Sequence, residues 1–212
     1  MKGLAEIYGP SFFSEWGPSH RAYTESAEII TDAISEQFRP ARLADLGCGC
    51  GVYGHLFSAG GVEVISIDGV RPPPEHSFPV ELQLRDLTEP LENTWGRFDL
   101  ALCLEVAEHI PEELLPRFLK NITSFSDTLL LSAAPPHQGG HHHVNERPRR
   151  YWVARLRGAG FAYDRKATGI LCERLKTSGL PYMWMGAHIC VYRRALSRRE
   201  LDHGLAFNVG LS

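Results

Sequence analysis

Short apolar segments alternate with stretches of helical periodicity through most of this chain, and that alternation constrains the fold more than any other feature. The apolar segments are continuous, as in strands that are buried on both faces. They predict strands at residues 43–46, 62–67, 80–84, 98–104 and 128–133, and helices at 52–59, 114–122 and 149–159. The pattern therefore predicts an α/β fold with a doubly wound, mostly parallel sheet and helices on both faces.

The two ends of the chain depart from this alternation. The first twenty residues are aromatic but interrupted by glycine and proline, so we expect an irregular lead-in before a helix from about Ser19 to Arg39. Two further strands are expected at 161–166 and 187–193, on either side of an apolar insertion at 179–186. No change of composition marks a second domain, and 212 residues are the length of one domain.

Composition and charge exclude several classes of partner. The formal net charge of -3 gives no electrostatic support for nucleic-acid binding, and no apolar run approaches the ~18 residues of a membrane span. The chain reaches Glu6 before any apolar segment that could act as a signal peptide. Its five cysteines are odd in number and contain no CxxC pair, which favours reduced thiols. We therefore expect a cytoplasmic protein with neither nucleic acid nor membrane as a partner.

A glycine-rich segment, Asp45 to Gly51, follows the first predicted strand and opens a helix. Ligands of parallel sheets bind at the carboxyl ends of the strands, and alternate glycines leave backbone amides free to approach a ligand there. Gly49-x-Gly51-x-x-Gly54 also fits a dinucleotide fingerprint, which is weak evidence by itself. Asp45 favours a ligand with a cationic amine instead, because a carboxylate would repel a pyrophosphate.

Two further acids follow the next strands. Asp68 suits the two hydroxyls of a ribose as a bidentate acceptor, a feature that NAD and adenosine sites share. Asp86 is either an acceptor for the exocyclic amine of adenine or a turn residue. Acids at three strand ends are thus expected to hold one nucleoside ligand that also carries an amine.

Four motifs carry a resemblance to a known family: LADLGCGCG at 43–51, VISIDG at 64–69, LRDL at 84–87 and FDLALCLEVAEHIP at 98–111. The chain resembles the class I S-adenosylmethionine-dependent methyltransferases. GGHHHVNERPRRYW at 139–152 is similar to the branch often found near small-molecule and glycan biosynthesis. The resemblance implies a Rossmann-like sheet of seven strands with a reversed last strand, S-adenosylmethionine as the cofactor and a small-molecule acceptor.

The resemblance also implies which residues contact the cofactor. Asp45 and the glycines after it would hold the methionine part, Asp68 the ribose and Asp86 the adenine edge, while backbone groups of Cys103 to Glu105 would line the methionine side. The expected set is Asp45, Gly47, Cys48, Gly49, Gly51, Asp68, Gly69, Asp86, Leu87, Cys103 and Leu104. One departure is Cys50, which replaces a small residue, often threonine or serine, in relatives.

The candidate catalytic residues are His143, Glu105 and His109. Methyl transfer to a hydroxyl requires removal of a proton, so we expect His143, which follows the fifth strand, to act as the general base. The alternative is that His143 orders its loop, and Glu108-His109 is expected to be mainly structural.

The histidine cluster, His137 with His141 to His143, is expected to bind no metal. Adjacent residues in one loop rarely direct three rings at one ion. No acidic partner is expected beside them at ligand spacing.

Three other clusters each have two interpretations. The arginines between 147 and 157 form either a solvated helix face or a surface that steers an anionic substrate. The aromatic residues between 8 and 16 are either a lid over the adenosine or cover for the core. The insertion at 179–186 suits an adaptable pocket wall or the contact of a homodimer.

Three functions remain open at this point. The first is methyl transfer from S-adenosylmethionine to a small molecule, preferably at a hydroxyl oxygen, by in-line displacement with a His or Glu base. A non-catalytic S-adenosylmethionine-binding subunit or sensor is the second, and an NAD-dependent oxidoreductase, which Asp45 disfavours, is the third. The single domain is expected to comprise a lid and helix at 1–40, a cofactor-binding core at 41–166, and an insertion, last strand and tail at 167–212.

Overall fold

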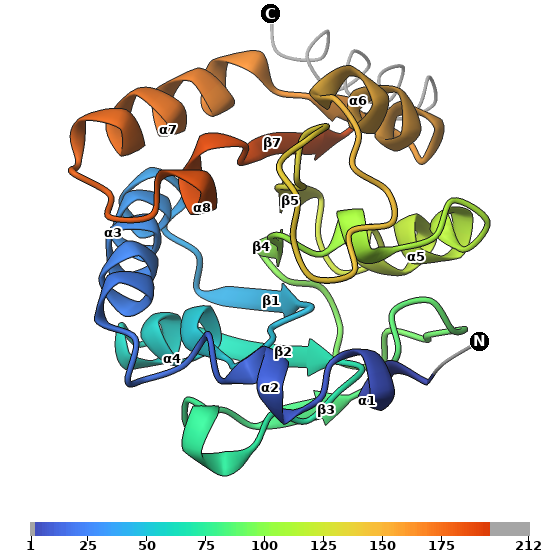
Figure 1. The fold of residues 1–212 in the computed structure, drawn as a ribbon. Coiled ribbons are helices and arrows are strands. Elements are labelled where there is room, and N and C mark those ends of the chain that lie inside the picture. Colours follow the sequence, from blue (N-terminus) through green and yellow to red (C-terminus); the bar gives the residue numbers. More distant parts are fainter. Residues whose placement is uncertain (1–2, 196–212) are drawn as a thin grey trace, which may run out of the picture.

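The computed structural model describes residues 3–195, and seven strands among them form one sheet (Figure 1). The strands are β1 (Arg42–Leu46), β2 (Glu63–Asp68), β3 (Leu82–Leu84), β4 (Leu100–Cys103), β5 (Thr128–Leu131), β6 (Phe161–Tyr163) and β7 (Cys190–Arg194). Their order is β3-β2-β1-β4-β5-β7-β6, and β7 runs antiparallel to both of its neighbours. This confirms the expected mostly parallel sheet with a reversed last strand.

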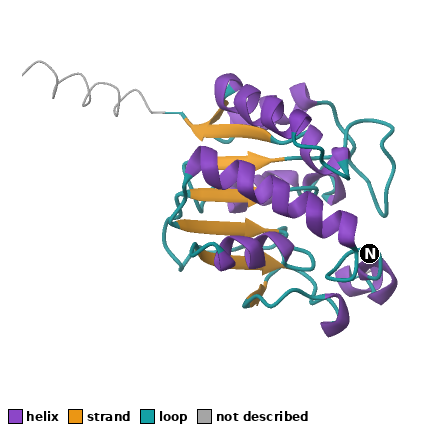
Figure 2. Cartoon of the chain, turned by 90° about the vertical axis from the view of Figure 1, so that its left-hand side faces the viewer, coloured by secondary structure: helices purple, strands orange, loops and turns teal. Residues whose placement is uncertain are grey.

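Helices cover both faces of the sheet, as Figure 2 shows from the side. One face carries α3 (Arg21–Phe38), α4 (Val52–Ala59), α7 (Arg165–Thr177) and α8 (Met183–Ala187), and the other carries α5 (Leu115–Ile122) and α6 (Arg149–Gly158). The two faces bury separate clusters of apolar side chains. Successive residues of β1 alternate between them, since Leu43 packs in the first and Ala44 in the second.

The helix α7 is absent from the sequence-based expectations, which extended a strand to residue 166. Asp164 caps this helix by accepting a hydrogen bond from the amide of Ala167 at 2.9 Å. Ala167, Leu171 and Leu175 are buried at helical spacing. An acidic N-cap residue followed by apolar residues at helical spacing predicts a helix, so the sequence contained the evidence for α7.

The expectation of an irregular lead-in is wrong in part. Two single-turn helices, α1 (Leu4–Ile7) and α2 (Pro10–Phe13), lie before α3, and Pro10 occupies the first turn of α2, where its missing amide hydrogen costs nothing. Short 3-10 turns also occur at η1 (Pro74–His76) and η2 (Ala107–His109). Within residues 3–195, no helix combines the length and apolar character that crossing a bilayer would need.

Candidate active site

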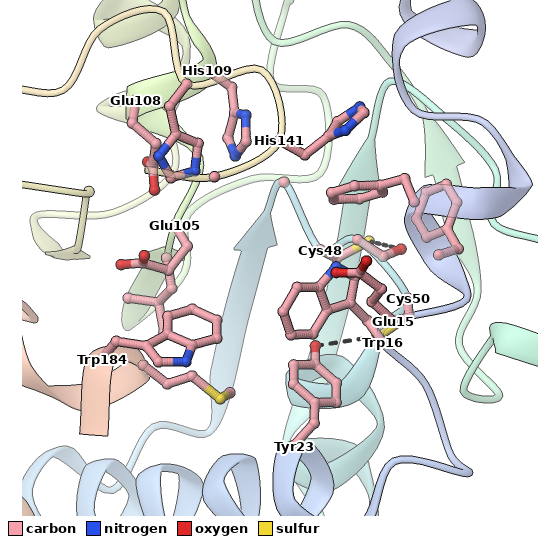
Figure 3. Close-up of a pocket in the computed structure, with 18 of the residues that line it drawn as sticks. Glu15, Trp16, Tyr23, Cys48, Cys50, Glu105, Glu108, His109, His141 and Trp184 are labelled. Carbon is pink, nitrogen blue, oxygen red and sulfur yellow. Dashed lines mark hydrogen bonds between the residues drawn. The ribbon is translucent and has the colours of Figure 1, made fainter. Parts of the chain in front are cut away.

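A cavity of about 490 Å³ lies where β1 and β4 end (Figure 3). Its lining comes from five segments: the lead-in at 12–16, the glycine-rich segment at 45–50, the turn after β4 at 104–109, the loop at 138–143, and α8 at 184–185. Tyr23 and Tyr53, which the sequence did not single out, also line it. Three of these segments contain predicted site residues, so the fold brings the expected motifs to one place.

Residues 45–54 form one side of the cavity, which we call the glycine wall. The amides of Gly47 and Cys48 both donate to the carbonyl of Ile67, at 2.8 and 3.0 Å, and fold the segment back on β2. Gly47 has φ +81°, and a Cβ there would lie 2.4 Å from Cγ2 of Val106. Gly49 also has a positive φ, of +55°, but no atom lies within 4 Å of its Cβ position. Tight packing therefore requires glycine at 47, whereas the backbone at 49 faces open space.

Asp45 is buried in the glycine wall, with 3% of its surface exposed. Its Oδ2 accepts a hydrogen bond from the amide of Gly54 at 3.1 Å. Burial raises the pKa of Asp45 to about 7, and the hydrogen bond from Gly54 partly opposes this rise. Because Asp45 lines the cavity, a cationic amine bound there would supply the counter-charge that this carboxylate lacks.

Asp68 lies beside the glycine wall and outside the lining of the cavity. Its two oxygens accept hydrogen bonds from the amides of Gly49 at 2.8 Å and Val70 at 2.9 Å. Burial raises the pKa of Asp68 to about 6. The lead-in covers this corner, since a Cβ on Gly69 would lie 2.6 Å from Cδ1 of Leu4.

The remaining predicted cofactor residues divide into two groups. Cys48 and Leu104 line the cavity with Asp45, Gly47 and Gly49. The oxygen Oδ1 of Asp86 accepts hydrogen bonds from the amide and hydroxyl of Thr88, as expected of a turn residue. The residues of the set that do not line the cavity are Gly51, Asp68, Gly69, Asp86, Leu87 and Cys103, of which Leu87 and Cys103 lie in the apolar core.

Glu105, Glu108, His109 and His143 line the opposite side of the cavity. Together with Glu146, which bonds to His143 from outside the lining, they form what we call the histidine wall. Figure 3 shows Glu105, Glu108 and His109 along this side, across the cavity from Cys48. The structure therefore brings all three predicted catalytic residues, His143, Glu105 and His109, to the cavity.

Several polar atoms of the histidine wall are buried without a hydrogen-bond partner among the described residues. They are Oε1 of Glu105, both carboxyl oxygens of Glu108 and Nδ1 of His109. Burial raises the pKa of Glu108 well above its usual range, and the charge of Glu105 raises it further. Burial lowers the pKa of His109 to about 4, so its imidazole is neutral at neutral pH.

His143 is held by an acidic neighbour that the sequence-based reasoning overlooked. Its Nδ1 lies 3.0 Å from Oε1 of Glu146, which also accepts from the amide of Gly139, while Oε2 accepts from the amide of His137. The expectation that the histidine cluster lacks an acidic partner is therefore wrong. Glu146 lies three residues after His143, so the sequence alone could have identified it as a partner. The approach of His143 to Glu108 depends on the fold.

The lead-in closes over both walls. Phe12, Phe13 and Trp16 line the cavity, and the ring of Trp16 lies 5.7 Å from that of Trp184 in α8. The imidazole of His141 reaches the carbonyl oxygen of Ile7 at 2.7 Å. Residues of the lead-in and of the insertion at 179–186 thus also line the cavity.

The arginine cluster lies outside the lining of the cavity. Arg147 and Arg155 pair with Glu112, and none of the five arginines between 147 and 157 is among the lining residues. The structure accounts for this pair as part of an exposed ion-pair network. Steering of an anionic substrate by the cluster therefore has no support from the geometry.

Comparisons with known proteins give the family. A model described as a methyltransferase domain matches residues 19–183. The ubiquinone biosynthesis O-methyltransferase of Aeromonas salmonicida is 30% identical over 106 residues, which cover 46% of this chain and 44% of that protein. The match thus spans less than half the length of that relative.

Solved structures share the fold. A 1,6-didemethyltoxoflavin-N1-methyltransferase of Burkholderia thailandensis, with bound 1,6-didemethyltoxoflavin and S-adenosylhomocysteine, has a TM-score of 0.61 at 18% identity and covers 91% of this chain and 89% of its own. The magnesium protoporphyrin IX methyltransferase of Synechocystis PCC 6803 with bound SAM has a TM-score of 0.56 at 18% identity, with 90% and 89% covered. With its family match and its sheet order, this chain belongs to the class I S-adenosylmethionine-dependent methyltransferases.

Proposed function

We propose that this chain transfers a methyl group from S-adenosylmethionine to a hydroxyl oxygen of a small-molecule acceptor, with a His or Glu side chain accepting the proton. One observation carries the proposal: a buried carboxylate in the glycine wall and a group of bases in the histidine wall line the same cavity of about 490 Å³. A cationic cofactor and a protic acceptor would thus have separate partners on opposite sides.

The glycine wall fits the methionine end of the cofactor. Asp45 would hold the amine, and the open backbone at Gly49 allows a ligand to approach without meeting a side chain. Asp68 and Asp86 lie close together at the ends of β2 and β3, as an adenosine site requires, but both already accept hydrogen bonds from the chain itself. When bound, S-adenosylmethionine supplies an electrophilic methyl group on a positively charged sulfur.

His143 is the best placed proton acceptor. Its bond with Glu146 favours the tautomer with the proton on Nδ1, so Nε2 would remain free to accept a proton from the acceptor hydroxyl. His109 is a weaker base, because its pKa is lowered to about 4. Glu105 is the carboxylate alternative, held by Gln138, whose Nε2 lies 3.4 Å from Oε2.

Aromatic side chains from two elements would exclude water from the reaction. The ring of Trp16 packs against Trp184 and, at 5.5 Å, against Tyr23, and all three line the cavity. Excluding water strengthens every electrostatic contact with the acceptor. This contact supports the interpretation of the lead-in as a lid.

Two measurements test the proposal. Calorimetry should detect binding of S-adenosylmethionine and S-adenosylhomocysteine but not of NAD. S-adenosylhomocysteine should then accumulate only when a phenol, sugar or carboxylic acid acceptor is added, with the methyl group on oxygen. Methylation at nitrogen or carbon would contradict the hydroxyl assignment, and cofactor binding without turnover across the acceptors would favour a sensor.

The proton acceptor is tested by His143→Gln with His142→Asn as its matched control. His142 lies in the same loop with φ +56° and outside the cavity lining, and asparagine tolerates that backbone conformation. We expect the first substitution to lower kcat by roughly 10²- to 10⁴-fold and the second to change it little. Full turnover in His143→Gln would remove His143 from the mechanism.

A further inference from the structure

Three side chains of the histidine wall direct ligating atoms toward one another. One atom each from Glu108, His109 and His143 can be chosen so that all lie within 4.8 Å of each other. Glu108 and His109 come from η2, and His143 comes from a loop more than thirty residues later. Carboxylate oxygen with two imidazole nitrogens is a ligand set suited to divalent transition cations.

Two of these three side chains, Glu108 and His109, have buried polar atoms without a hydrogen-bond partner in the part of the chain that the structure describes. Glu108 is fully buried, and neither of its carboxyl oxygens has a hydrogen-bond partner among residues 3–195; the same holds for Nδ1 of His109. Native proteins rarely leave buried polar atoms unpaired, so such a group requires an explanation. A proton shared between Glu105 and Glu108 would pair one oxygen of each carboxyl, but it would leave Nδ1 of His109 without a partner among the described residues.

The orientation of His143 is also fixed as in a metal site. Its Nδ1 is bonded to the Glu146 carboxylate, which is itself held by two backbone amides. Metal-binding histidines usually bond their second ring nitrogen to a carboxylate or carbonyl, which orients the ring and raises its basicity. This leaves Nε2 of His143 for a ligand.

The backbone ties the two halves of the cluster together. The amides of Val144 and Asn145 donate to the carbonyl of Glu108 at 3.0 and 2.9 Å, and Nδ2 of Asn145 donates to the carbonyl of Ile110 at 3.1 Å. A Cβ on Gly140 would lie 2.3 Å from Nε2 of His143, so glycine at 140 makes room for this ring. The cluster is therefore built by the fold and not by chance contact of mobile side chains.

We infer that Glu108, His109 and His143 bind one divalent cation of the Mn²⁺, Co²⁺ or Zn²⁺ type. Glu105, Glu108, His109 and His143 all line the cavity, so an acceptor in the cavity would lie beside a cation held there. Such a cation would favour an acceptor with a hydroxyl or carboxylate oxygen. This reading of the acceptor rests on the proposed function, whereas cation binding does not. With the cation bound, His143 is one of its ligands, and Glu105, the carboxylate alternative of the proposed function, accepts the proton instead.

Cobalt provides a readout that is independent of activity. Untagged full-length protein is stripped with chelator and titrated with Co²⁺ alone, while visible absorption reports the coordination and calorimetry the stoichiometry. We expect one equivalent to bind with a nitrogen- and oxygen-type spectrum and to raise the thermal unfolding midpoint. Failure to bind one equivalent, or a spectrum of hexaaqua cobalt only, would overturn the inference.

Variants locate the cation. Glu108→Gln, His109→Gln and His143→Gln should each weaken Co²⁺ binding at least about tenfold, and Glu146→Gln should weaken it roughly 10- to 100-fold through His143 alone. The control His142→Asn should bind as the parent does. Circular dichroism checks that each variant is folded, and parent-like cobalt binding in folded Glu108→Gln and His143→Gln would reject the site.

The outcomes separate this inference from the proposed function. Cobalt binding without methyl transfer to any oxygen acceptor would support the cation site and remove the proposed function. Methyl transfer at an unchanged rate after complete chelation, with no cobalt bound, would support the proposed function and remove the cation site.

Discussion

The glycine wall and the histidine wall face each other across one cavity but are built in different ways. In the glycine wall, the carboxylates accept hydrogen bonds from backbone amides, Asp45 from Gly54 and Asp68 from Gly49 and Val70. In the histidine wall, the carboxyl of Glu108 and Nδ1 of His109 have no such partner among the described residues. The acids of the glycine wall thus have hydrogen-bond partners within the described chain, whereas Glu108 and His109 have buried polar atoms that do not.

The difference has a physical origin in the backbone. Residues 45–54 contain the turn between β1 and α4, so free amides are available there for the acids. Around Glu108 the amides of Val144 and Asn145 donate to its backbone carbonyl and not to its carboxyl. The polar side chains of the histidine wall therefore depend on one another or on what binds in the cavity.

The largest expected effect comes from removing what covers both walls. Deleting residues 1–18 should abolish detectable S-adenosylmethionine binding, a loss of about 100-fold or more, because Phe12, Phe13 and Trp16 line the cavity. The sheet and the helices from α3 onward should remain folded. Calorimetry measures the loss, and circular dichroism checks the core; unchanged affinity would show that the lead-in is only cover.

The next effect tests the glycine wall by pH. Burial raises the pKa of Asp45 to about 7, against ~3.9 in an unfolded chain, so between about pH 4 and 7 the folded state retains a proton that the unfolded state has lost. The contribution of Asp45 to stability therefore falls as the pH rises through this range, by roughly 4 kcal/mol at most.

Asp45→Asn should remove this pH dependence because the amide does not ionise. The fold should tolerate the change, since the amide oxygen can still accept from Gly54. Chemical unfolding of the parent and the variant at several pH values gives the difference directly. The free energy of unfolding of the variant should exceed that of the parent by a margin that grows from pH 4 to 7, while S-adenosylmethionine binding is weakened. A pH-independent difference would contradict the burial of this charge.

A matched pair of substitutions sharpens the contrast between the walls. Glu108→Gln should stabilise the metal-free protein by roughly 1–3 kcal/mol at high pH, by a margin that grows as the pH rises, because burial disfavours the charged carboxylate and the amide does not ionise. Asp68→Asn should destabilise it by about the same amount, because the amide group would face a backbone amide. Chemical unfolding measures both, and equal signs would remove the contrast.

The smallest expected effect separates two positions within the glycine wall. Gly49→Ala should cost about 1 kcal/mol of stability from its left-handed backbone alone. Gly47→Ala should cost more, because its Cβ also meets Val106. Thermal unfolding of the two variants compares their stabilities. A larger loss of stability for Gly49→Ala than for Gly47→Ala would contradict the open space beside Gly49.

Local sequence predicted the glycine wall and most of the fold. Asp45 to Gly51, the helix at 52–59 and the positions of most strands along the chain depend on short-range signals, such as continuous apolar runs and alternate glycines. The helix α7 had equally local signals in Asp164 and the stripe of Ala167, Leu171 and Leu175, so it was predictable in principle.

The histidine wall was only partly predictable. Glu105, His109 and His143 were expected near the mouth of the site. The approach of His143 to Glu108 depends on how the loop at 138–143 returns to η2, which the sequence does not indicate. The same is true of Leu4 against Gly69, where the lead-in meets the end of β2. Such contacts join distant parts of the chain, and no period or motif encodes them.

The bond between His141 and the carbonyl of Ile7 has a practical consequence for experiments on this protein. It fixes the amino end of the described chain beside the histidine wall, where Tyr8 also packs 5.6 Å from His109. A polyhistidine tag fused ahead of Leu4 would bring foreign imidazoles within reach of that wall and could compete for a cation. Because β7 runs antiparallel to its neighbours, Arg194 lies near the start of β5, at the end of the sheet away from the cavity.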